Sequence, residues 1–111
     1  MHPSRAALYT LALALAAGQA HAAAKAKGPD GGEIMKKYDC LSCHQPKRKV
    51  VGPAFVDIAK KYKGNKGVVA VLVKKVKDGG SGNWGAIPMA AHPSISDADI
   101  EAMVKYVLAQ K

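Results

Sequence analysis

Residues 39–46 of this chain read DCLSCHQP, and this stretch holds both cysteines of the 111-residue sequence. Cys40 and Cys43 are separated by two residues, and His44 follows the second cysteine directly. Such a pair can form a disulfide, supply half of a zinc site, or attach a larger group to the chain. The residues around the pair help to decide between these roles.

A zinc site needs about four protein ligands, commonly two cysteine pairs or one pair with two histidines. After residue 22, the only cysteine or histidine outside this stretch is His92. In addition, His44 is poorly placed to bind the same ion as its neighbour Cys43. A redox-active dithiol needs a strand–helix–strand context, which this sequence lacks. Zinc binding, a dithiol and a plain disulfide are therefore the disfavoured alternatives.

The third role is the covalent attachment of haem. Cysteines at positions i and i+3 of a helix lie on one face, so both sulfurs can reach the vinyl groups along one edge of a porphyrin. His44, four residues after Cys40, can then ligate the iron. The pattern Cys-x-x-Cys-His is typical of c-type haem attachment. We therefore predict one haem c, bound through thioethers of Cys40 and Cys43 and ligated by His44.

The start of the chain is typical of a secretory signal peptide. A basic stretch over 1–5 leads into an apolar run over 6–17, and small residues follow up to Ala22. A membrane anchor is the alternative, but a bilayer core takes roughly 20 apolar residues. We predict a signal peptide over 1–22, which is removed, a flexible arm over 23–30, and one exported domain over 31–111 without stable membrane insertion.

Removal of 22 of the 111 residues would leave 89. A domain of this size is only marginally stable by itself and usually needs disulfides or a metal. Two cysteines allow one disulfide at most, whereas a haem brings a large apolar surface that helices can cover. We therefore predict that the haem-free chain is largely unfolded.

Four helices are predicted by the spacing of apolar residues. The first covers about 31–41, and the second opens at Gly52-Pro53. The third is the valine-rich segment 67–78, for which a buried strand is the alternative, and the fourth starts at Ser96. The loop over 79–95 shows neither helical nor strand period. The sequence therefore predicts an all-α domain with one long loop.

Met89 lies in this loop, where no helical period explains an apolar residue. A methionine that fills the core is the alternative, and it suits Met35 and Met103 on their helical faces better. We predict that Met89 is the second axial ligand of the iron. With both axial positions filled, electron transfer is favoured over oxygen or peroxide chemistry, so we expect an electron-transfer protein and no enzyme.

The motifs CLSCH, VGPAF and WGAIPM and the closing segment ISDADIEAMVKYVLAQK resemble the small bacterial class I cytochromes c. The resemblance extends over about 31–111. It implies a compact all-α fold, with about four short helices around one covalently bound haem and with crossing terminal helices. It also implies a periplasmic carrier of single electrons between periplasmic or membrane-bound respiratory partners, such as a terminal reductase or oxidase.

The resemblance further implies roles for two cofactor-binding residues. The Pro53 carbonyl would accept a hydrogen bond from the His44 ring, and Trp84 would donate its indole N–H to a haem propionate, with simple packing as the alternative for Trp84. Many relatives have prolines and an asparagine after the ligand methionine, whereas this chain has Ala90, Ala91 and His92. We expect a less stiff loop, with His92 in solvent; a minor form with His92 on the iron is the alternative.

The formal net charge of +9, or +8 without Arg5, comes almost entirely from lysines. Nucleic-acid binders favour arginine, so we predict no nucleic acid partner. Instead, we expect a monomer whose lysines steer the exposed haem edge onto acidic redox partners. The alternatives are a haem-binding subunit of a larger respiratory complex and a haem sensor or peroxidase-type enzyme.

Overall fold

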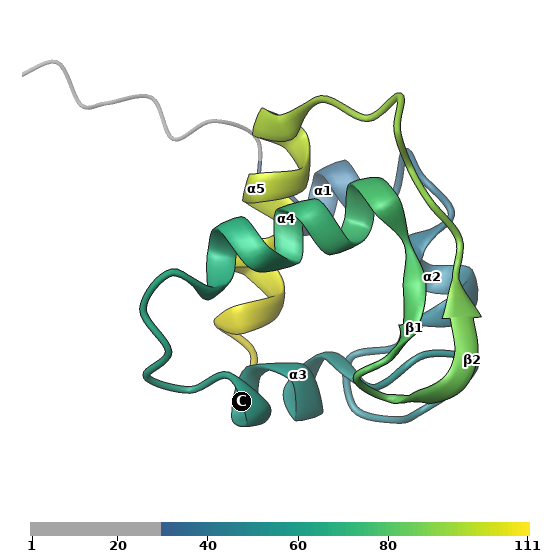
Figure 1. The fold of residues 1–111 in the computed structure, drawn as a ribbon. Coiled ribbons are helices and arrows are strands. Elements are labelled where there is room, and N and C mark those ends of the chain that lie inside the picture. Colours follow the sequence, from purple (N-terminus) through teal and green to yellow (C-terminus); the bar gives the residue numbers. More distant parts are fainter. Residues whose placement is uncertain (1–29) are drawn as a thin grey trace, which may run out of the picture.

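The computed structural model describes residues 30–111, so the predicted signal peptide and the arm up to residue 29 lie outside the described residues. The described chain forms five helices and one two-stranded antiparallel sheet (Figure 1). In chain order these elements are α1 (Gly31–Met35), α2 (Cys40–Cys43), α3 (Phe55–Lys61), α4 (Val68–Asp78), β1 (Gly80–Gly82), β2 (Gly85–Met89) and α5 (Asp97–Leu108).

Helix α5 is the element against which α1, α3 and α4 pack. The side chain of Ser96 caps its N-terminus by accepting a hydrogen bond from the Asp99 backbone N–H at 3.2 Å. Asp97 and Asp99 place negative charge in the first turn, where the helix dipole favours it. This confirms the predicted last helix and its start at Ser96. No helix of residues 30–111 is long and apolar enough to cross a membrane.

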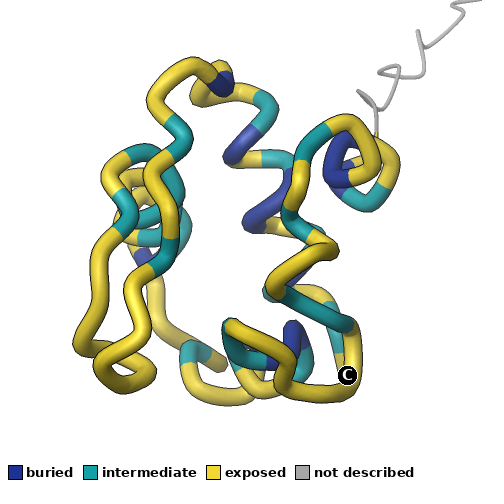
Figure 2. Tube along the Cα trace, turned by 90° about the vertical axis from the view of Figure 1, so that its right-hand side faces the viewer, coloured by how far each residue is buried: buried dark blue, intermediate teal, exposed yellow. Residues whose placement is uncertain are grey.

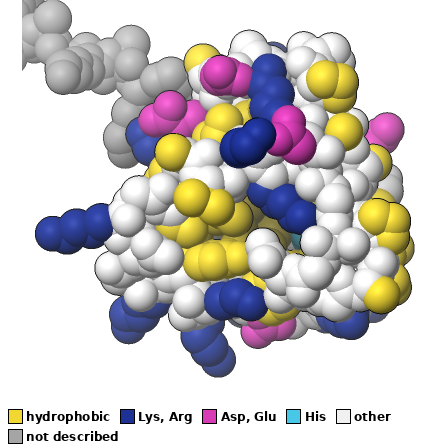
Figure 3. All heavy atoms as spheres, viewed as in Figure 1, with side chains coloured by type: hydrophobic (Ala, Val, Ile, Leu, Met, Phe, Trp, Pro, Cys, Tyr) yellow, Lys and Arg dark blue, Asp and Glu magenta, His cyan; other side chains and the backbone are white. Residues whose placement is uncertain are grey.

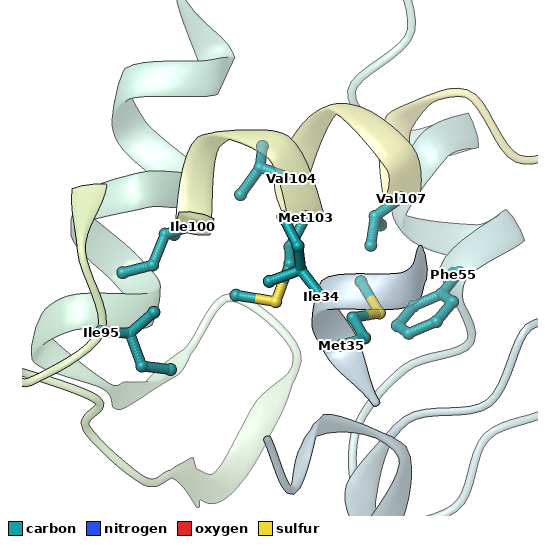
Figure 4. Close-up of a cluster of buried hydrophobic side chains, with 8 residues drawn as sticks. All are labelled: Ile34, Met35, Phe55, Ile95, Ile100, Met103, Val104 and Val107. Carbon is teal, nitrogen blue, oxygen red and sulfur yellow. The ribbon is translucent and has the colours of Figure 1, made fainter. Parts of the chain in front are cut away.

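The core lies between α5 and its three neighbours, and its side chains point toward one another (Figure 4). Its members are Ile34, Met35, Phe55, Ile95, Ile100, Met103, Val104 and Val107. Met35 and Met103 are buried here, which confirms that these two methionines fill the core. Burial is concentrated in the helices, whereas the β1–β2 hairpin is mostly exposed (Figure 2).

The single helix predicted over 31–41 is wrong, because two short helices replace it. After α1 the backbone N–H groups of Lys36, Lys37 and Tyr38 donate to carbonyls three residues back. These bonds tighten the turn and end the regular helix, so Leu41 is exposed. The second predicted helix also begins later, at Phe55, which leaves the Pro53 carbonyl outside the helix.

Helix α4 confirms the helical prediction for the valine-rich segment, and it ends at Asp78, before Gly79. The prediction of a loop without strands over 79–95 is wrong. Strands β1 and β2 pair there, with Gly80 opposite Met89 and Gly82 opposite Gly85. Despite this hairpin the domain is mostly helical, in agreement with the predicted fold class.

Candidate functional site

A cavity of about 440 Å³ opens beside the core. All six predicted site residues border it, and they are Cys40, Cys43, His44, Pro53, Trp84 and Met89. The surface of the cavity is mostly apolar, and its other lining residues include Ile58, Leu72 and Val104. Figure 3 shows hydrophobic side chains gathered in a hollow on one face, with lysine and arginine side chains around it. A cavity of this size lies within the usual range for cofactor sites, roughly 300–1,000 Å³.

Helix α2 consists of the four residues from Cys40 to Cys43, so the helix spans the distance between the two thiols. Both cysteines are free, and they differ in environment, because Cys40 is half-buried and Cys43 is exposed. The Cys40 sulfur lies 4.0 Å from the Met103 sulfur. Burial raises the pKa of the Cys40 thiol. Both thiols therefore remain available for bonds to a group in the cavity.

His44 ends α2 and turns into an extended conformation. Its Nδ1 lies 2.8 Å from the carbonyl oxygen of Pro53. Since a carbonyl only accepts hydrogen bonds, this contact assigns the proton to Nδ1 and leaves the lone pair of Nε2 free to bind a metal. The ring stacks on Phe55, with 5.8 Å between the ring centroids and an interplanar angle of 24°. His44 is thus oriented from two sides.

Met89 and Trp84 belong to the hairpin on the other side of the cavity. Met89 ends β2 and is half-buried, whereas Trp84 lies between the two strands and is 40% exposed. The Lys61 ammonium group lies 4.5 Å from the centroid of the Trp84 ring and also donates a hydrogen bond to the Asn83 carbonyl at 3.0 Å. A cation at this distance attracts the ring face, so α3 holds the tip of the hairpin.

Sequence reasoning missed three residues that shape this site, namely Gly52, Gly79 and Lys61. A methyl group on Gly52 would lie 2.4 Å from Cε1 of the His44 ring, so the ring needs a glycine there. Gly52 belongs to the VGPAF motif, but it was predicted only as a helix start.

His92 is half-buried and borders the cavity, so its expected position in solvent is wrong.

These residues fit a haem. Two free thiols, an oriented imidazole and a thioether border one cavity whose remaining lining is mostly apolar. This donor set is the one by which c-type haems are attached and ligated. Among residues 30–111, no group of three or more His, Cys, Asp or Glu residues comes together as a metal cluster. A mostly helical domain with such a site is a class I cytochrome c.

Comparison with known proteins supports this class. The chain belongs to the cytochrome c family, whose sequence profile matches residues 16–111. It is 44% identical over 79 residues to cytochrome c-552 of Nitrosomonas europaea, which covers 71% of this chain and 77% of that protein. It is 42% identical over 81 residues to cytochrome c-551 of Azotobacter vinelandii, which covers 73% of this chain and 98% of that protein.

Solved structures show the same likeness. The crystal structure of wild-type Nitrosomonas europaea cytochrome c552 matches with a TM-score of 0.69 at 44% identity, over 72% of this chain and 99% of that chain. The predicted fold class, family and cofactor are thereby confirmed. The protein is an electron carrier rather than an enzyme, and it carries one covalently bound haem c.

Proposed function

We propose that this protein is a periplasmic carrier of single electrons, in which Cys40 and Cys43 hold the haem while His44 and Met89 ligate its iron. The observation that carries the proposal is the shared cavity, because Cys40, Cys43 and His44 lie at α2, Met89 ends β2, and all four border it. Bound haem c supplies an iron that accepts and releases one electron.

The side chains around the cavity favour the reduced state. The Met89 thioether is a soft ligand, and a histidine–methionine pair raises the reduction potential. The apolar lining acts in the same direction, since an additional positive charge is less stable in a medium of low dielectric constant. The Pro53 carbonyl lowers the reduction potential modestly, because a hydrogen bond from Nδ1 makes the His44 ring a stronger electron donor to the iron. The net effect is a raised reduction potential, so the reduced haem keeps its electron until an acceptor binds.

Trp84 and Pro53 complete the proposed binding set. Pro53 fixes the tautomer of His44, and Trp84 donates its indole N–H to a haem propionate. The position of Trp84 at the rim of the cavity supports this role, because it borders the cavity and is still 40% exposed. The neighbouring Lys61 adds a positive charge beside it, which also favours a carboxylate there.

The surface charges support docking on an acidic redox partner. In the part of the chain that the structure describes, the ion pairs include none of the six cations Lys47, Arg48, Lys49, Lys60, Lys61 and Lys63. By contrast, Lys74 pairs with Asp78, and Lys77 pairs with Asp97 at 3.0 Å. The group Lys74, Lys75 and Lys77 is thus partly neutralised, and the cations at 47–49 and 60–63 carry the attraction. Residues 1–22 would direct export and would then be removed.

The proposed iron site is tested by comparing a variant of the proposed ligand methionine with a variant of a core methionine. The holoproteins Met89→Leu and Met103→Leu are compared by mass, by visible spectra and by carbon monoxide binding to the reduced form. Met89→Leu should lose the ferric iron–sulfur charge-transfer band and bind carbon monoxide readily. Met103→Leu should keep the band, because Met103 lies in the core. Retention of the band in Met89→Leu would exclude Met89 as the ligand.

Salt dependence tests the proposed partner. The association rate with an acidic redox protein should fall steeply with added salt, since the screening length shrinks to about 10 Å at 0.1 M. Lys60→Gln should lower the rate more than Lys74→Gln, because Lys60 is exposed and takes part in no ion pair among the described residues, whereas the charge of Lys74 is already paired with Asp78. A rate that is independent of salt would rule out electrostatic steering and leave the iron site unaffected.

A further inference from the structure

The C-terminal end of α4 lies directly against the segment that follows Met89. Gly79 caps the helix with φ +67° and ψ −152°, a conformation that is essentially restricted to glycine. A methyl group on Gly79 would lie 2.4 Å from the Met89 carbonyl oxygen, 2.8 Å from the Ala91 nitrogen and 2.9 Å from the Ala90 carbonyl carbon. The backbone over 89–91 therefore occupies the space that any side chain at position 79 would need.

A second contact holds the same segment one residue further along. The His92 backbone N–H is shared between the Val76 carbonyl at 3.0 Å and the Lys77 carbonyl at 3.2 Å. Carbonyls in the last turn of a helix lack partners within the helix, so this N–H satisfies groups that would otherwise need water. Four consecutive residues, 89–92, thus rest on one end of α4. We call the Val76 and Lys77 carbonyls together with Gly79 the α4 seat.

We infer that the α4 seat positions Met89, and that Gly79 is its central positioning residue. The inference rests on the proposed ligation of iron by Met89. Ala90 and Ala91 lack the fixed φ angle that proline would provide, so the segment after Met89 is not stiffened by its own covalent structure. Contact with α4 replaces that stiffness and sets how deeply Met89 reaches into the cavity.

The contact at Gly79 cannot be relieved by a side-chain rotation, because its three closest atoms all belong to the backbone. Real Cβ atoms essentially never approach another heavy atom within 3.0 Å, so a methyl group at position 79 must push the 89–91 backbone away from α4. The displaced backbone carries Met89 with it. The Met89 sulfur should then bind iron more weakly, whereas His44 lies in a different segment and should be unaffected.

Gly64 provides a matched control for the strain at a positive φ angle. Its φ of +74° is close to the +67° of Gly79, yet a methyl group on Gly64 would meet no atom within 4 Å. Gly64→Ala therefore places a side chain at a positive φ angle without the contact. An effect on Met89 that appears in Gly79→Ala and not in Gly64→Ala is not a general result of a side chain at a positive φ angle, and it arises where Gly79 meets the 89–91 backbone.

The experiment compares the holoproteins of wild type, Gly79→Ala, Gly64→Ala and Met89→Leu. Gly79→Ala should weaken the ferric iron–sulfur charge-transfer band and raise the carbon monoxide affinity of the reduced protein by about ten- to hundredfold, the range to which typical overpacking strain converts. Gly64→Ala should change the unfolding midpoint alone. Equal bands and equal affinities in the two alanine variants would overturn the inference, whereas a band retained in Met89→Leu would overturn the proposed ligation instead.

A second pair of variants covers the case in which Gly79→Ala yields no holoprotein. His92→Pro removes the N–H that binds the Val76 and Lys77 carbonyls, whereas His92→Ala keeps it and also lacks the imidazole. His92→Pro should show a weaker band and a higher carbon monoxide affinity than His92→Ala. Identical spectra and affinities in this pair would contradict a seat that positions Met89.

Discussion

Gly52→Ala should disturb the His44 ring through contact alone. The φ angle of Gly52 lies outside the left-handed range, so alanine can adopt the same backbone conformation. The added methyl group would lie 2.4 Å from Cε1, 2.8 Å from Nδ1 and 3.0 Å from Nε2 of the ring. The ring has little freedom to move aside, because Nδ1 is bound to the Pro53 carbonyl at 2.8 Å and Phe55 stacks on it.

The cost follows from these contacts. Overpacking of a tight site typically costs about 1–3 kcal/mol, and loss of the bond from His44 to Pro53 would add about 0.5–1.5 kcal/mol. In a domain of 60–100 residues each kcal/mol lowers the midpoint of thermal unfolding by roughly 4–8 °C. Gly52→Ala should therefore unfold at least about 6 °C below wild type, and the ring N–H of His44 should exchange faster with solvent.

Thermal unfolding of the holoprotein, followed by circular dichroism, measures the first effect, and NMR of the His44 ring proton measures the second. Val50→Ala is the control, because Val50 lies two residues from Gly52, does not border the cavity and is 45% exposed, and such surface changes usually stay within about 0.5 kcal/mol. If Gly52→Ala unfolded at the same temperature as Val50→Ala and kept a protected ring proton, the argument that the ring is wedged in place would be refuted.

Three further predictions concern the fold around the site. Ile34→Ala should lower the free energy of unfolding by about 2–5 kcal/mol in denaturant titrations, because Ile34 is 2% exposed in the core. Ser96→Ala should cost about 1 kcal/mol in the same titrations through loss of the α5 cap, whereas Ser94→Ala, in the preceding turn, should change little. The Tyr38 hydroxyl donates to Asp99 at 3.1 Å, and this bond raises the pKa of Tyr38 above its ordinary 10.0. A raised pKa means that the bond stabilises the fold fully below pH 10 and is lost as the pH rises through the folded-state value, so the stability advantage of wild type over Tyr38→Phe should shrink in alkaline titrations; a constant difference would contradict this assignment.

The two longest helices could be predicted from the sequence because each presents one apolar face over several turns. Helix α5 adds a Ser96 cap and acidic residues in its first turn, so local signals and burial agree. Helices α1 and α2 have five and four residues, which is too short for a period to develop. Their separation depends on the turn formed by the Lys36, Lys37 and Tyr38 N–H groups, and no pattern of apolar residues encodes that turn.

The hairpin was missed for a different reason. Its strands are exposed on both faces except at Met89, so apolar and polar residues do not alternate along them. Pairing of Gly80 with Met89 arises because α4 delivers the chain to this place and because Lys61 holds Trp84 at the tip. The contact from Lys61 joins residues more than 20 positions apart in the sequence, and local propensity carries no information about it.

In the candidate site, too, some residues could be predicted from the sequence and others could not. Residue types with distinctive chemistry, such as the two cysteines, His44 and Met89, stand out in the sequence because their spacing or isolation needs an explanation. Gly52 and Gly79 do not stand out, since their contribution is the absence of a side chain at a point of close approach. Gly52 leaves room for the His44 ring, and Gly79 leaves room for the backbone at Met89, so each glycine accommodates one of the two proposed ligands. The positions of both ligands are therefore set by excluded volume as well as by hydrogen bonds, and a single methyl group at either glycine should disturb one ligand without disturbing the other.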